Sequence, residues 1–455
     1  MDFSEKNTDA VYDVSTLGTS KTLILGLQHL FAMFGATVLV PALTGLNVST
    51  TLLFAGLGTL LFHLVTGRKV PAFLGSSFAF LGGYAAIAPM IDGVPNTTML
   101  PYACFGVFTA GMVYLVLAAM FKVFGANKVM RFFPPIVTGP IIICIGLSLA
   151  GSAISNCRSN WLIAIVAILV VVVCNVWGKG MVQIVPILLG VVASYLFAVI
   201  IDPAARANVV TAVASADWIG FPVIWENTVF SIFDGEFDGG ILLTSVVTIA
   251  PVALAALVEH VGDMCAISST VGKNFVADPG LHRTLTGDGL ATALAALFGA
   301  PANTTYGENT GVLALSKVYD PKVVRLAAVF AIILSFCPKF AALIVAMPAA
   351  TMGGVSLVLY GMISAVGVRN VVENQVDFTK SRNVLIAAMI LGLAVGISYN
   401  GAVVIPVGSI TISMSGLAVA ALVGIAMNAV LPGMDYEFGA NEKGDTSVNF
   451  GSRHK

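Results

Sequence analysis

Long apolar segments, separated by short polar ones, recur along the whole chain. Each is close to the ~20 residues that a helix needs to cross a bilayer. The pattern predicts an all-α polytopic membrane protein with about fourteen transmembrane segments. The predicted spans cover residues 21–44, 48–66, 70–90, 100–122, 128–152, 160–178, 182–201, 242–270, 281–299, 301–318, 322–345, 349–366, 382–400 and 407–430.

Polar residues interrupt the tenth span at 301–311, where the chain reads Pro-Ala-Asn-Thr-Thr-Tyr-Gly-Glu-Asn-Thr-Gly. Proline ends a helix, and Asn and Thr favour extended or turn backbone. Glu308 would then lie at the start of a new half-helix, where the helix dipole favours a carboxylate. Non-helical backbone survives in hydrocarbon only where protein or a water-filled cavity satisfies it. The break predicts a transport site, with a space-filling re-entrant loop as the alternative.

The third span contains a similar break, which opens with Pro71-Ala72 as the tenth opens with Pro301-Ala302. Gln28-His29 and Val258-Glu259 show the same offset of 230 residues. Because each half would hold an odd number of spans, the halves must have opposite orientation. We therefore expect two inverted 7-span repeats. Short strands in broken spans 3 and 10, at about 73–78 and 303–307, would cross and point two half-helix N-termini at one cavity.

The distribution of basic residues predicts the orientation in the membrane. If the N-terminus is cytoplasmic and the spans alternate, all but three of the 22 Lys and Arg residues lie in cytoplasmic loops. The exceptions are Arg158, Arg206 and Lys339. Cytoplasmic loops are typically enriched in Lys and Arg. We therefore expect both termini to be cytoplasmic and residues 202–241 to form an extracytoplasmic loop.

Composition excludes several classes of function. Only 10% of the residues are charged, against about 25% in soluble proteins. The six cysteines form no CxxC pair, and no metal-ligand spacing, phosphate-binding loop or nucleophile motif is present. We predict neither an enzyme nor a cofactor or metal site, and no nucleic-acid partner. Transport would have to run on an ion gradient.

Ionisable residues within the predicted spans are the candidates for chemistry. Glu259 and Asp263 lie one helical turn apart on one face of the eighth span, where two ionised carboxylates would repel each other. They form a candidate proton site, with a neutral interhelical hydrogen bond as the alternative. Asp288, early in the ninth span, could cap that helix or couple to the site. His29 is a candidate supporting residue, and His260 is more typical of a packed histidine.

Several of these motifs resemble the nucleobase–ascorbate transporters, also called nucleobase–cation symporter family 2, and are most similar to bacterial uracil permeases. The similarity covers about residues 20–430 and is carried by residues 28–41, 75–80, 259–262, 278–283 and 303–311. The resemblance implies a homodimeric, proton-coupled symporter that imports uracil across the cytoplasmic (inner) membrane. It divides the chain into tails 1–20 and 431–455, core-domain segments 21–122 and 242–345, and gate-domain segments 123–201 and 346–430.

The resemblance also implies roles for individual residues. Glu259 and Glu308 would accept the ring N–H groups of the base, and the backbone at Phe78 and Gly307 would meet its carbonyls. Tyr306 and Tyr360 would line the pocket. Proton coupling would involve Glu259, Asp263, His29 and Asp288. The uracil permeases carry histidine where this chain has Asp263, so a proton symporter for xanthine or another purine nucleobase is the alternative.

Overall fold

Helices form nearly all of the regular structure. The computed structural model describes residues 10–91, 94–234, 237–407, 410–434 and 436. Its α-helices are α1 (Thr19–Thr44), α2 (Val48–Val65), α3 (Leu81–Ile87), α4 (Leu100–Phe124), α5 (Ala126–Met130), α6 (Pro135–Cys157), α7 (Trp161–Trp177), α8 (Met181–Ile184), α9 (Pro186–Ile201), α10 (Pro203–Ser215), α11 (Gly239–Ile249), α12 (Val252–Val271), α13 (Leu281–Leu297), α14 (Gly307–Ser316), α15 (Pro321–Ser335), α16 (Pro338–Val345), α17 (Ala349–Glu373), α18 (Ser381–Asn400) and α19 (Gly416–Val430). Shorter helical turns are η1 (Val14–Leu17), η2 (Phe78–Phe80), η3 (Trp225–Asn227), η4 (Val229–Phe233) and η5 (Val276–Gly280), and the strands are β1 (Leu74–Ser76), β2 (Asn303–Thr305), β3 (Val403–Val407) and β4 (Ile410–Met414).

The described helices confirm a multi-pass membrane fold. Seven helical segments within the described ranges are long and apolar enough to cross a membrane, or nine if each of two bent pairs counts as one span. Other predicted spans correspond to shorter helices, such as α7 with 17 residues and α19 with 15. The number fourteen therefore stays a prediction.

Two sharp bends contradict the predicted helix boundaries. The span predicted at 322–345 is not one helix, because α15 and α16 meet at a bend of 86°. Residues 202–241, predicted to be a loop, begin with α10, which turns 111° away from α9. Both bends contain a proline at the first position of the second helix, where its missing amide costs little. The helices α10 and α16 pack against each other.

The ends of the predicted spans 349–366 and 407–430 are also wrong. The helix α17 continues to Glu373. The strands β3 and β4 pair antiparallel, so α19 begins only at Gly416. The side chain of Ser415 caps this helix by accepting a hydrogen bond from the Ala418 amide. Val, Ile and Thr are common in these strands and favour extended backbone. The span prediction counted only apolar residues, and apolar strands and apolar helices look alike by that measure.

The helices pack in two groups, which we call group A and group B. In group A, α2 and α4 pack on α13, α15 packs on α1 and α2, α12 packs on α14 and α4, and α14 packs on α1. In group B, α17 packs on α6 and α7, α7 packs on α9, and α18 packs on α6 and α19. The contact of α6 with α17 is close because residue 146 is glycine: a Cβ there would lie 2.1 Å from the Tyr360 carbonyl oxygen.

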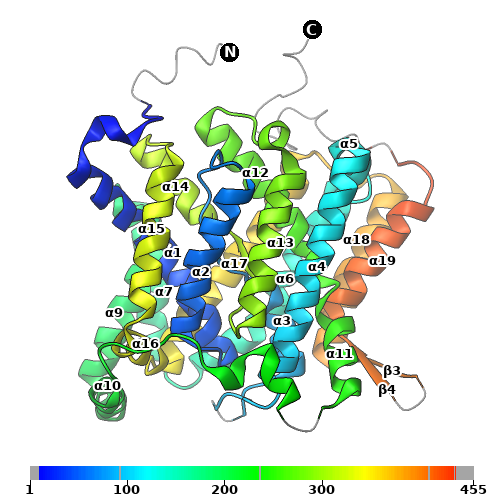
Figure 1. The fold of residues 1–455 in the computed structure, drawn as a ribbon. Helices are drawn as coiled ribbons and strands as arrows, with labels where there is room; N and C mark the ends of the chain where they lie inside the picture. Colours follow the sequence, from blue (N-terminus) through cyan, green and yellow to red (C-terminus); the bar gives the residue numbers. More distant parts are fainter. Residues whose placement is uncertain (1–9, 92–93, 235–236, 408–409, 435, 437–455) are drawn as a thin grey trace.

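Both ends of the described chain lie at one face of the molecule, whereas α10 and the β3–β4 hairpin lie at the opposite face (Figure 1). The N-terminal residues, predicted only as a tail, dock at this first face. The Val11 amide donates to the Lys317 carbonyl at 2.9 Å, and the Tyr12 hydroxyl donates to the Val271 carbonyl at 2.8 Å. This segment therefore joins the ends of α14 and α12.

Candidate functional site

Two short strands cross at the centre of the site. β1 pairs antiparallel with β2, with Gly75 opposite Thr304. The pairing extends on both sides, because the Ser77 amide donates to the Ala302 carbonyl and the Tyr306 amide donates to the Phe73 carbonyl. The strands lie within the two segments predicted to be extended. Their hydrogen bonds satisfy backbone that a hydrocarbon environment would leave unpaired.

A threonine on a neighbouring helix satisfies the outer edge of each strand. Thr59 on α2 accepts a hydrogen bond from the Leu74 amide at 2.9 Å and donates to the Leu74 carbonyl at 3.3 Å. Thr292 on α13 makes the same two bonds to Asn303, at 3.2 and 2.9 Å. Both hydroxyls replace the strand partner that a two-stranded sheet lacks. In both halves of the chain, a threonine hydroxyl therefore pairs with the outward-facing amide and carbonyl of the strand.

Tyr306 connects the strand crossing to α1. Its hydroxyl donates to the Ser76 carbonyl at 2.8 Å and lies 3.3 Å from the Thr37 hydroxyl. The ring lies directly against Gly75, where a Cβ would be 2.5 Å from two ring carbons. Position 75 therefore requires glycine for this close approach of backbone and ring.

A cavity of about 690 Å³ lies between group A and group B. This size falls within the range typical of small-molecule sites. Of the predicted site residues, the cavity brings together Phe78, Glu259, Asp263, Tyr306, Gly307 and Glu308. Two half-helices begin at the wall of the cavity, one at Phe78 and one at Gly307. The first amides of any helix lack intrahelical partners, so these amides are available to a ligand. No atom lies within 4 Å of the position that a Cβ of Gly307 would take.

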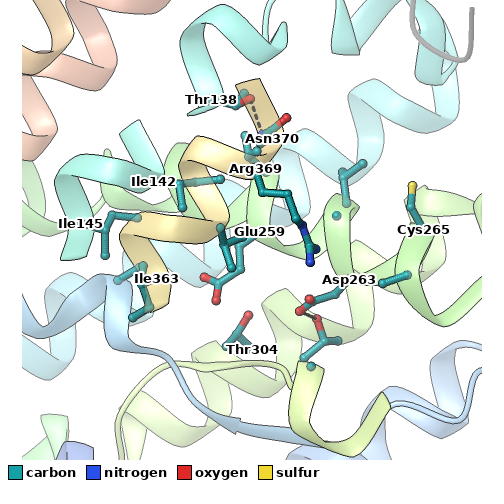
Figure 2. A pocket seen from close by; sticks show the side chains of 18 of the residues that line it. Thr138, Ile142, Ile145, Glu259, Asp263, Cys265, Thr304, Ile363, Arg369 and Asn370 are labelled. Carbon is teal, nitrogen blue, oxygen red and sulfur yellow. Dashed lines mark hydrogen bonds between the residues drawn. The ribbon is translucent and has the colours of Figure 1, made fainter. Parts of the chain in front are cut away.

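Three of the four carboxylates that line this cavity come from α12 and α14. Glu259 and Asp263 project from α12 one turn apart, and Glu308 lies in the first turn of α14. Figure 2 shows Glu259 and Asp263 with Thr304 beside the strand crossing. The Thr305 hydroxyl donates to Asp263 Oδ2 at 2.6 Å, which ties α12 to β2. The described residues contain no group of three or more His, Cys, Asp or Glu side chains arranged to hold a metal ion.

Asp288 does not cap a helix, so that alternative is wrong. The helix α13 begins at Leu281, and Asp288 lies two turns inside it with its side chain fully buried. Asp288 Oδ2 is 2.8 Å from His260 Nδ1, and His260 Nε2 is 3.0 Å from the Thr284 hydroxyl. None of these three residues lines the cavity. The group joins α12 to α13 behind the acids, which agrees with His260 as a packed histidine.

His29 and Tyr360 also lie outside the cavity lining. The Asn309 side-chain amide donates to the His29 carbonyl at 2.9 Å and lies 3.1 Å from His29 Nδ1, which joins α14 to α1. Tyr360 is fully buried, and its ring lies edge-on to Phe78 with centroids 6.4 Å apart. It supports a cavity residue instead of forming the wall.

The end of α17 contributes residues that the sequence reasoning missed. Arg369, Asn370, Glu373 and Asn374 line the cavity. The predicted span ended at residue 366, before these side chains. The signal was present, because the lining residues of this helix recur at helical spacing. They are Leu359, Met362, Ile363, Val366, Arg369, Asn370, Glu373 and Asn374.

Comparison with known proteins shows the family to which the sequence belongs. Residues 20–403 match the sequence profile of a family described as the permease family. The uracil permease of Bacillus caldolyticus is 41% identical over 93% of this chain and 94% of that protein. The uracil permeases of Bacillus subtilis (strain 168) and Escherichia coli (strain K12) are 37% and 38% identical, over 89% and 90% of this chain and 91% of each relative.

Solved structures of transporters share the fold. The transmembrane domain of a cyanobacterial bicarbonate transporter matches with a TM-score of 0.52 and 14% identity, covering 90% of this chain and 97% of that one. A murine solute carrier 26 anion transporter in the inward-facing state matches with a TM-score of 0.60 and 11% identity, covering 94% and 69%. These two matches concern the fold alone. The profile match and the relatives above lead to one assignment: the chain belongs to the permease family of the nucleobase–ascorbate transporters.

Proposed function

We propose that this protein imports uracil across the cytoplasmic membrane by proton-coupled symport. The observation that carries the proposal is the cavity that is lined by Glu259, by Glu308 and by the first residues of two half-helices. Uracil permeases that are 37–41% identical over about 90% of the chain support the choice of substrate.

The chemistry of the cavity matches the edges of uracil. Uracil is planar and neutral, with two N–H donors and two carbonyl acceptors. Glu259 and Glu308 accept the N–H groups, while the backbone amides at Phe78 and Gly307 donate to the carbonyls. Tyr306 lines the pocket, and Tyr360 acts on it through Phe78. Each buried polar group of the ligand then has a partner, and an unpaired one would be costly.

Alternating access follows from two groups of helices with the site between them. We assign group A to the core domain, residues 21–122 and 242–345, and group B to the gate domain, residues 123–201 and 346–430. The matching threonine contacts to β1 and β2 support two inverted repeats of seven spans. In this arrangement the core domain carries the substrate past the gate domain, and the protein forms a homodimer in the inner membrane.

Glu259 and Asp263 are the proposed proton-coupling pair. Both face the cavity, and Asp263 is joined by Thr305 to the strand that precedes Glu308. His29 and Asp288 have supporting roles, because each contacts a helix that carries an acid without reaching the cavity itself. Protonation neutralises the pair before the core domain crosses a low-dielectric region.

Uptake of labelled uracil, with unlabelled xanthine as competitor, tests the proposal in cells that lack their own carriers. We expect saturable uptake that a protonophore abolishes and that excess xanthine leaves nearly unchanged. Competition by xanthine as strong as by uracil would favour the purine alternative. Uptake no greater than in cells with empty vector would contradict both substrates.

Labelling of single cysteines tests the orientation. A cysteine in α10 should react with a membrane-impermeant maleimide added outside intact cells, whereas one in the loop at 67–70 should react only after the cells are opened. This result would support cytoplasmic termini. Labelling of both positions from the same side would contradict the fourteen-span arrangement.

A further inference from the structure

Among the described residues that line the cavity, Arg369 is the only cation. The other charged lining residues are Glu259 and Asp263 on α12, Glu308 on α14 and Glu373 on α17. Four acids and one base therefore face the same space. The proposed function uses three of the acids and leaves Arg369 without a role.

Arg369 crosses the boundary between the two groups of helices. It belongs to α17 in group B, whereas Asp263 and Glu259 belong to α12. Figure 2 shows its guanidinium extending from α17 toward Asp263. In this state Arg369 Nε lies 3.5 Å from Glu373 Oε1, one turn along the same helix.

The contact with Glu373 is of a kind that is easily exchanged. The two side chains are 67% and 47% exposed, and exposed pairs at this spacing contribute little because water screens them. A carboxylate inside the cavity attracts a guanidinium more strongly, since the surrounding dielectric is lower. The balance between the two partners therefore depends on whether the acids in the cavity are ionised.

We propose that Arg369 exchanges partners during transport. It pairs with Asp263 when the cavity is empty and its acids are ionised, and it returns to Glu373 when substrate and proton occupy the acids. Arg369 thus balances the charge of the empty carrier while α12 moves past α17. It is a positioning residue that contacts no substrate, and the inference rests on the proposed transport function.

The test compares two modes of transport in proteoliposomes. Exchange of labelled for unlabelled uracil uses only the loaded carrier, whereas net uptake also requires the empty carrier to return. We expect Arg369→Gln to slow net uptake roughly tenfold, while uracil binding and exchange stay within about twofold of the parent. Arg369→Lys, which keeps the charge, should restore most of the net uptake. Lys128→Gln removes an exposed cation from α5 outside the cavity and should match the parent.

Three results would overturn the role of Arg369. They are net uptake by Arg369→Gln at the parent rate, an equal loss of exchange and net uptake, and an Arg369→Lys variant as slow as Arg369→Gln. Failure of the proposed function itself would look different, because the parent protein would then exchange no uracil.

Discussion

The two broken segments at the centre of the molecule have the same backbone design and different chemistry. In both, a three-residue strand is held at its outer edge by a threonine from a neighbouring helix, Thr59 in the first half and Thr292 in the second. A half-helix follows each strand. The first begins with Phe78-Ala79-Phe80, and the second begins with Gly307-Glu308-Asn309.

The difference shows which property the membrane constrains. Backbone polar groups must be satisfied in hydrocarbon whatever the side chains are, so both halves keep the same contacts. Side chains at the half-helix starts are free to diverge. The first half presents an apolar wall, while the second places a carboxylate in the cavity opposite the acids of α12. Charge is thus concentrated in one half, and the other half contributes shape and backbone amides.

The strongest test of this division is removal of the carboxylates. Glu308→Gln and Glu259→Gln each replace a charged acceptor and should weaken uracil binding by roughly tenfold to a hundredfold, the equivalent of about 1.5–3 kcal/mol. Equilibrium binding to purified protein measures the effect. Asp377→Asn, in the exposed loop after α17, is the matched control and should bind normally. Parent-like binding by both glutamine variants would show that the acids are not the acceptors.

Glycine substitutions compare the first break, where Gly75 packs against a ring, with the second, where Gly307 borders open space. Gly75→Ala places a methyl group against the Tyr306 ring and should lower the free energy of unfolding by about 1–3 kcal/mol. Gly307→Ala meets no atom within 4 Å and should leave stability unchanged while it intrudes on the ligand. Thermal unfolding in detergent, with and without uracil, distinguishes the two. Equal destabilisation by both substitutions would contradict the contrast.

Asp263→Asn tests a contact that the first half lacks, because Ser76, which holds the position in β1 that corresponds to Thr305, donates instead to the Thr37 carbonyl at 3.0 Å. We expect a severalfold loss of accumulation against an imposed pH gradient, with uracil binding nearly unchanged since it depends on Glu259 and Glu308. Thr305→Val removes the donor to Asp263 and should act in the same direction with a smaller effect. If Asp263→Asn accumulates uracil like the parent, Glu259 alone remains as the proton site.

The threonine contacts test what the two halves share. Thr59→Val and Thr292→Val keep the side-chain shape and leave one amide and one carbonyl of a strand unpaired. Each should lower the free energy of unfolding by about 1 kcal/mol, and by a similar amount in the two variants. Thr66→Val is the control, because Thr66, the residue after α2, donates to the Phe62 carbonyl of that same helix and touches neither strand. Destabilisation by only one of the two variants would show that the halves are not equivalent.

The sequence by itself determined the membrane class, the two breaks and the acids within the spans. These features follow from local composition: apolar length predicts crossing helices, and proline followed by Asn and Thr interrupts them. The spacing of Glu259 and Asp263 also places them on one helix face without any knowledge of neighbours. The family resemblance, carried by short motifs, agreed with the later comparisons.

Only the tertiary structure decided which helix each polar group meets. Asp288 could be a cap or a site residue by sequence, and contact with His260 from α12 places it behind the cavity. Tyr360 lies behind Phe78, and Arg369 enters the cavity because α17 continues past its apolar part. The bends at Pro203 and Pro338 were likewise not predicted. The apolar pattern joined α15 and α16 into one span and gave no helix at the position of α10. These outcomes depend on packing between segments far apart in the chain, and a hydrophobicity pattern, which averages over near neighbours, does not contain that information.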